Sequence, residues 1–140
     1  MLKDKIQEYR KNIDTLREMT GDETQVFEYM IDLGKKLQKY PLSEEKRTEQ
    51  NKVTRCQFDM YVDLEDGVWR AYSNGMISSG YAYILLDVFN AISADEASQV
   101  KLEDFNELGI KDLLSMNRAN GFYEMIDIMR RNALQATEHR

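Results

Sequence analysis

The residue of this sequence best suited to covalent chemistry is its single cysteine, Cys56. Cys56 follows Arg55 and precedes Gln57, where a polar stretch gives way to alternating apolar residues. Because these neighbours are not apolar, we do not expect the thiol in the core. The cations of Lys52 and Arg55 would favour the thiolate, which is the nucleophilic form of the side chain. Most lone cysteines are inert, so position alone leaves a reactive and an inert thiol both open.

Other catalytic and metal sites find little support. A structural zinc site needs about four ligands, whereas the chain has one cysteine and one histidine. We expect that histidine, His139, to lie in a frayed end and not in a catalytic pair. Gly75 and Gly80 lack the surrounding pattern of a nucleotide-binding loop. A carboxylate metal site stays formally open, although scattered Asp and Glu are usually solvated surface.

The composition predicts a single domain over residues 1–140. Hydrophobic residues make up 42% and charged residues 31% of the chain, as in ordinary globular domains. The net charge of -6 disfavours nucleic acid and anionic membranes as partners. No stretch approaches the roughly 18 apolar residues of a membrane span, and the first residues lack the apolar run of a signal peptide. A lone cysteine suits a reducing compartment, so we expect the protein in the cytoplasm.

Apolar residues recur at helical spacing along much of the chain. The spacing predicts longer helices at about 2–19, 23–39, 76–92 and 118–135, and short ones after position 93 and over 103–108. Ser93 and Glu96 have the spacing of a capping box. Ser115 or Asn117 could cap the last helix.

Between the second and third helices the hydrophobic period changes. Residues 42–52 are polar and are expected to form a loop. Apolar residues then alternate over 58–64, which predicts a half-buried strand. A turn at 65–67 and a returning strand over 68–72 complete a hairpin. Helices on either side of a small antiparallel sheet predict an α+β domain, with Cys56 at the junction of the loop and the first strand.

Three segments carry an ordered set of motifs. They are QNKVTRCQ at 50–57, SNGMISSG at 73–80, and LSMNRANG at 114–121 preceded by LGI at 108–110. Together they resemble the SufE family of sulfur-acceptor proteins, which includes CsdE. The resemblance covers about Thr24 to Leu134. Any one motif is weak, but the ordered set is specific.

The resemblance implies a SufE/IscU-like fold and a sulfur-transfer role. Cys56 would accept persulfide sulfur from a cysteine desulfurase similar to SufS or CsdA, stimulate that enzyme, and deliver the sulfur to an iron–sulfur cluster scaffold similar to SufBCD. The carrier would need no cofactor of its own, because PLP belongs to the desulfurase. It would act as a transfer protein and not as a free-standing enzyme, either as a monomer or as a weak dimer.

Four further residues are assigned supporting or partner-binding roles. Arg118 matches the arginine of the third motif, and we expect it to stabilise the Cys56 loop or a partner contact. Asn51 and Gln57 are expected to hold loop geometry through side-chain hydrogen bonds. Arg55 replaces the usual glycine of the family, and it would stiffen the loop or lower the pKa of the thiol.

Two other functions remain open. One is a regulatory partner that docks on a desulfurase without taking sulfur, and its activity would survive Cys56→Ser. The other is a thiol-based redox protein. Such proteins often use a second, resolving cysteine, and this chain has none.

Overall fold

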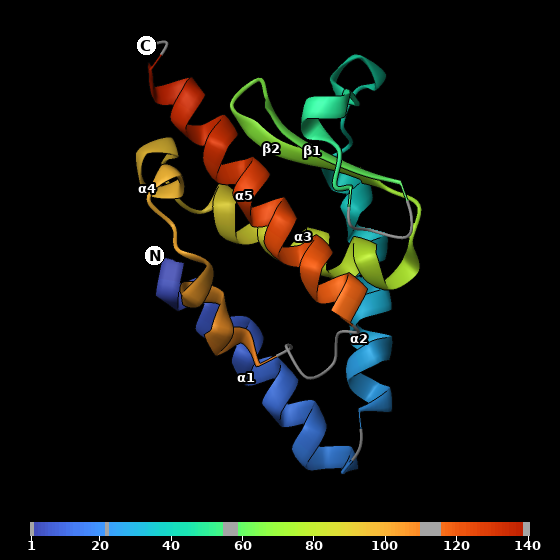
Figure 1. The fold of residues 1–140 in the computed structure, drawn as a ribbon. Coiled ribbons are helices and arrows are strands. Elements are labelled where there is room, and N and C mark those ends of the chain that lie inside the picture. The colour runs from blue at the N-terminus through green and yellow to red at the C-terminus, as the bar shows by residue number, and fades with distance from the viewer. Residues whose placement is uncertain (1, 22, 55–58, 110–115, 139–140) are drawn as a thin grey trace.

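The computed structural model describes residues 2–21, 23–54, 59–109 and 116–138, with the backbone alone for residues 116 and 117. Its main elements are α1 Leu2–Thr20, α2 Thr24–Lys35, β1 Met60–Glu65, β2 Val68–Ser73, α3 Met76–Asn90, α4 Ala94–Ser98 and α5 Met116–Glu138. Within these ranges, the 3₁₀ helices η1 Lys36–Lys39, η2 Glu44–Lys46, η3 Glu49–Asn51 and η4 Leu102–Leu108 connect them. The predicted α+β class is confirmed, since a two-stranded antiparallel sheet packs against several helices (Figure 1).

Helix α3 forms the centre of the core. All residues from Ser78 to Leu86 are buried, so this helix is enclosed on every side and not only along one stripe. Helices α1, α2 and α5 and strand β2 all contact it, and α5 crosses it in Figure 1. A helix that is apolar all round has to be covered by other elements. The remaining elements are therefore arranged around α3.

Two glycines set the close crossing of α2 and α3. A Cβ atom added at Gly80 would lie 2.1 Å from the backbone oxygen of Met30. One added at Gly34 would lie 2.9 Å from both Met76 O and the Cβ atom of Ser79. Side chains at these positions would push the helices apart. Gly80 therefore has a packing role, within a segment that sequence analysis found unsuited to nucleotide binding.

The hairpin matches the alternating pattern of its sequence. Its register pairs Met60 with Ser73 and Glu65 with Val68. The turn residues Asp66 and Gly67 have φ of 55° and 78°, and tight hairpin turns favour positive φ at both central positions. The inward-facing side chains Met60, Val62, Trp69 and Ala71 are buried. Strand β1 contacts α5 and β2 contacts α3, so one face of the sheet closes the core.

Three details differ from the sequence-based expectations. The second helix is not continuous over 23–39, because α2 ends at Lys35 and the chain tightens into η1, which buries Leu37. The expected loop at 42–52 contains the short 3₁₀ helices η2 and η3. Asn117 does not cap the last helix, since α5 already begins at Met116 and Asn117 lies in its first turn. Ser115, the other proposed cap, lies outside the described residues.

The capping box of α4 is confirmed. The backbone N–H of Glu96 donates to Ser93 Oγ over 3.1 Å, and the backbone N–H of Ser93 donates back to the Glu96 carboxylate. Within the described ranges, none of the helices combines the length and apolar character required to cross a bilayer.

Candidate functional site

The predicted nucleophile and two of its supporting residues, Cys56, Arg55 and Gln57, lie outside the described residues. The structure does describe the chain on both sides of them, up to Thr54 and from Asp59 onward. These two flanking segments are held by hydrogen bonds to β1, β2 and α5. They fix where the intervening residues start and end.

Asn51 anchors the segment that leads to Cys56. Its side chain is buried, with 7% exposure. Its Nδ2 group donates to the backbone oxygen of Lys46 at 2.8 Å and to Asp63 Oδ2 at 3.0 Å. Its Oδ1 atom accepts from Asn132 Nδ2 at 3.0 Å, and the same Nδ2 group donates to Asp63 Oδ1 at 2.9 Å. The three side chains form a closed network that joins η3, β1 and α5.

Helix α5 holds the same segment at two further points. Arg131 Nη2 donates to the backbone oxygen of Gln50 at 2.6 Å. Thr54 Oγ1 donates to Glu124 Oε2 at 2.7 Å. Glu124 and Arg131 are seven residues apart, which is two turns, so both side chains lie on the same face of the helix. This face of α5 therefore supports the leading segment from Gln50 to Thr54.

The trailing segment is held by the sheet. The backbone N–H of Val53 donates to Met60 O at 2.9 Å, which ties the two flanks to each other. An isolated antiparallel bridge pairs Lys52 with Tyr61 next to it. The N–H of Asn74 donates to Asp59 O at 3.2 Å, which extends the β1–β2 pairing by one residue pair. Both ends of residues 55–58 thus start from fixed backbone.

Arg118 lies in the first turns of α5 and is half-buried. At a rise of about 1.5 Å per residue, it is about 9 Å along the helix axis from Glu124 and about 21 Å from Asn132. The edge-to-face contact of Phe122 with Tyr81 packs this end of α5 on the first turns of α3. Asn51, which contacts α5 at Asn132, and Arg118 are therefore not neighbours.

The charged and polar groups around the leading segment form a groove. It has a volume of about 260 Å³ and includes Lys46, Gln50, Asn51, Asp63 and Asn132 in its lining. Lys46 Nζ lies 3.9 Å from Asp63 Oδ2, which partly balances the carboxylate. Within the part of the chain that the structure describes, no three His, Cys, Asp or Glu side chains gather in a way that could hold a metal ion.

A second carboxylate secures the polar stretch at its other end. Ser43 donates to Glu65 through its backbone N–H at 3.2 Å and through Oγ at 2.7 Å. These hydrogen bonds, first from the side chain and then from the backbone, hold the pKa of Glu65 below its usual value. The segment from Ser43 to Asn51 is thus bonded to β1 at both of its ends.

Several residues of this arrangement were not found from the sequence. They are Asp63, Glu124, Arg131 and Asn132, none of which the sequence analysis singled out as a site residue. The available signal was spacing: positions 124 and 131 are two turns apart on one helix face, and position 132 is rotated by about 100° from position 131. The spacing alone does not say which segment that face contacts.

Comparison with known proteins agrees with this arrangement of segments. Residues 11–133 match the domain described as "SufE: Fe-S metabolism associated domain". An uncharacterised SufE-like protein of Synechocystis is 30% identical over 112 residues, which span 77% of this chain and 69% of that protein. One of Rhizobium meliloti is 33% identical over 71% of this chain and 76% of its own length.

A third relative carries a functional name. It is the cysteine desulfuration protein SufE of Plasmodium falciparum, 25% identical over 84% of this chain, and the match spans 50% of its length. The domain match includes both flanks of Cys56, the start of α3 and most of α5. The motifs, the α+β fold and this match over most of the sequence lead to one assignment: the chain belongs to the SufE family.

Proposed function

We propose that this protein accepts sulfur, as a persulfide on Cys56, from a PLP-dependent cysteine desulfurase. The observation that carries the proposal is the family match over residues 11–133, which includes Cys56. The name of the Plasmodium relative, a cysteine desulfuration protein, supports it. The hydrogen-bonded flanks of residues 55–58 add support, because a transfer residue has to start from a defined position on its carrier.

The proposed step is a thiol–persulfide exchange. The Cys56 thiol loses its proton, and the thiolate attacks the outer sulfur of the persulfide on the desulfurase. A new S–S bond forms at Cys56 while the S–S bond of the donor breaks. The donor cysteine leaves as a thiolate and takes up a proton, so the step needs no external oxidant or reductant. Its rate depends on the thiolate fraction and the access of Cys56.

Further parts of the proposal concern the partners. The carrier would hand its sulfur to an iron–sulfur cluster scaffold and would need no cofactor of its own. Arg118 and Asn51 would act as supporting residues, with Asn51 holding the leading segment in place. Location in the cytoplasm stays a prediction, and the name of an Arabidopsis relative places that protein in chloroplasts and mitochondria.

The test is an intact-mass measurement without reductant, after incubation with an active cysteine desulfurase and cysteine. We expect a gain of one or more sulfur atoms that maps to Cys56, is reversed by a thiol reductant, and is absent from Cys56→Ser. No gain in the presence of verified docking would contradict sulfur acceptance. Desulfurase stimulation that persists in Cys56→Ser would point to the regulatory role instead.

A further inference from the structure

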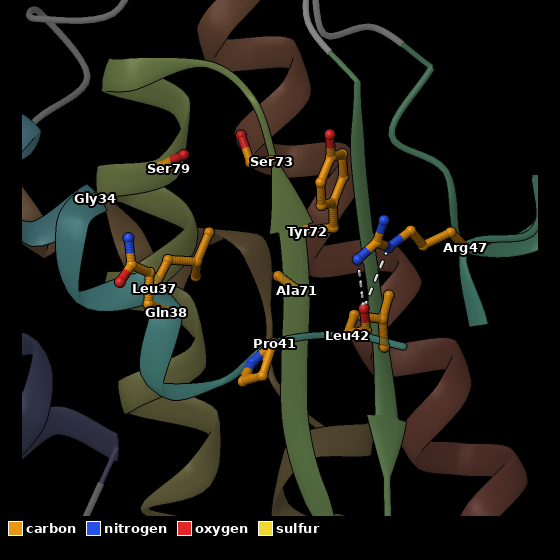
Figure 2. A pocket seen from close by; sticks show the side chains of 10 residues that line it. All are labelled: Gly34, Leu37, Gln38, Pro41, Leu42, Arg47, Ala71, Tyr72, Ser73 and Ser79. Atoms are coloured by element: carbon orange, nitrogen blue, oxygen red, sulfur yellow. Dashed lines mark hydrogen bonds between the residues drawn. The ribbon is translucent and has the colours of Figure 1, made fainter. Parts of the chain in front are cut away.

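A groove borders strand β2, with Leu37, Gln38 and Ser79 on the side away from β1 and with Tyr72 and Arg47 on the side of β1 (Figure 2). It has a volume of about 240 Å³ and is lined by residues of α2, η1, β2, α3 and the chain around η2. A second hollow of about 230 Å³ shares Gly34, Ser73 and Ser79 with it and continues to Met76. Each hollow is smaller than the roughly 300–1,000 Å³ of small-molecule sites. The pair therefore suits an elongated occupant better than a compact one.

Along the edge of β2 that faces away from β1, the backbone groups before Ser73 are already hydrogen-bonded. At Trp69, the side-chain amide of Asn90 accepts from the backbone N–H at 2.8 Å and donates to the backbone oxygen at 3.2 Å. At Ala71, the backbone N–H donates to Tyr40 O at 3.0 Å. The backbone N–H groups of both residues point away from β1, and each is hydrogen-bonded to a segment that covers this edge of the sheet. The fold thus protects this edge against pairing with another chain.

Ser73 is the next residue of β2 whose backbone N–H points away from β1. Backbone direction alternates along a strand, and the N–H of Asn74 points inward to Asp59 O. The N–H of Ser73 therefore points to the outer side, where this residue lines both hollows. Within the described ranges no acceptor satisfies that N–H. An unpaired edge of this kind accepts an extended peptide through backbone hydrogen bonds.

A guanidinium group is already positioned at the groove. Arg47 lies over the ring of Tyr72, 4.1 Å from the ring centroid. Its Nε and Nη2 atoms donate to Leu42 O at 3.2 Å and 3.0 Å, as Figure 2 shows. The stacking and the two hydrogen bonds fix the orientation of the group. Arginine carries five N–H donors, so others remain that can bind a carboxylate.

The charged side chains that line the groove are cations, and Asp32, 3.7 Å from Lys35 Nζ, partly balances one of them. The charged residues that line its two hollows, within the described part of the chain, are Arg47 and Lys35. Both are cations, in a protein whose net charge is -6. The floor is apolar at Leu37 and Ala71, and Met76 at the far end is 67% exposed. Exposed methionine at a binding surface adapts to varied apolar side chains.

We propose that this groove docks an extended, acidic segment of a partner protein, which pairs with β2 at Ser73 and places a carboxylate on Arg47. The backbone donor, the cationic lining and the apolar floor together fit alternating acidic and apolar side chains, because neighbours in an extended chain point to opposite sides. The inference goes beyond sulfur acceptance and does not depend on the chemistry of Cys56.

The test is an NMR titration of the isotope-labelled protein with a short, capped peptide of alternating glutamate and valine. We expect saturable shifts of the amides of Gly34, Gln38 and Ser73. Hydrogen exchange at Ser73 should slow about tenfold on saturation, because its N–H gains an acceptor. Arg47→Gln should weaken binding about tenfold, as expected for loss of a charge-assisted hydrogen bond.

Two controls separate the groove from general charge and from loss of folding. Lys35→Gln should weaken binding without affecting the fold, because Lys35 is exposed, whereas Lys11→Gln on the surface of α1 should bind as the wild type does. Shifts that map elsewhere, or a lysine–valine peptide or oligothymidylate bound equally tightly, would overturn the proposal. The proposal would also be overturned if hydrogen exchange at Ser73 were already slow without peptide and depended on protein concentration. A second copy of the chain would then occupy the edge.

Discussion

Replacing Asn51 tests whether the buried amide network holds the segment that leads to Cys56. Asn51 donates to Lys46 O and Asp63 Oδ2 and accepts from Asn132. Asn51→Ala removes all three hydrogen bonds and leaves the Asp63 carboxylate with fewer donors. Asn51→Asp keeps the size of the side chain and places a second carboxylate about 3 Å from the first, because Asn51 Nδ2 now lies 3.0 Å from Asp63 Oδ2.

The magnitude for Asn51→Ala follows from the partners. Two neutral hydrogen bonds contribute about 1 kcal/mol each, and the one to a carboxylate about 2 kcal/mol. Water can enter from the adjoining groove of about 260 Å³ and replace part of this loss. We therefore expect the free energy of unfolding to fall by about 2 kcal/mol, with little dependence on pH.

Asn51→Asp should add a pH dependence that Asn51→Ala lacks. Two carboxylates at this distance raise the pKa of the pair in the folded state. A carboxyl group whose pKa is higher in the folded state than in the unfolded state, where it is about 4, stabilises the folded protein below about pH 4. This stabilisation is lost as the pH rises. The variant should therefore be closest to the wild type near pH 4 and fall well below it at pH 7.

The assay is urea unfolding of the wild type and both variants between pH 4 and pH 8, with the slope checked for constancy. Gln25→Glu adds the same charge at an exposed amide on α2 and should stay within about 0.5 kcal/mol of the wild type. The reasoning would be refuted by an Asn51→Asp variant whose stability relative to the wild type does not fall as the pH rises. An Asn51→Ala variant as stable as the wild type would also contradict it.

Two further predictions concern the core. Gly80→Ala should lower the free energy of unfolding by about 2 kcal/mol despite its gain in helix propensity, because the new Cβ atom would lie 2.1 Å from Met30 O. Urea unfolding should show a smaller loss for Gly34→Ala, and equal losses would contradict the packing argument. The Tyr9 hydroxyl donates to Asp87 Oδ2 at 2.5 Å. Burial is the largest cause that raises the pKa of Tyr9 far above 10.0, and this hydrogen bond is the second. Wild-type stability should therefore fall as the pH rises above about 10, where the unfolded tyrosine ionises, and stability curves between pH 8 and pH 11 should be flatter for Tyr9→Phe.

The regular elements followed from local sequence patterns. The helical period of α1, α2 and α5 and the alternation in β1 arise because one side of each element is buried, and that cause acts on neighbouring residues. The end of α2 did not follow, because tertiary packing decides it. The chain tightens after Lys35 so that Tyr40 reaches the edge of β2 and its backbone oxygen accepts from Ala71.

The anchors of the site were predictable only in part. The family motif identified Asn51 as a residue that holds the geometry of the loop, but not its partners. Asn132 is 81 residues away in sequence and Asp63 is 12. Hydrogen bonds between residues so far apart produce no repeating pattern among neighbouring residues, so a single sequence does not reveal them. Arg118 was identified by the third motif, and the structure places it nearer the start of α5 than Asn132, the α5 residue that binds Asn51.

The way the two flanks are held bears on the proposed transfer. Docking costs free energy for every side chain and backbone segment that becomes ordered. Here Gln50–Thr54 is already bound to α5 and Asp59–Tyr61 to the sheet, so these residues add little to that cost. The Asn51 network is buried and expensive to break, whereas the Thr54–Glu124 hydrogen bond is exposed and can be replaced by water. A desulfurase that displaces the carrier backbone would therefore break the Thr54–Glu124 contact more easily than the Asn51 network.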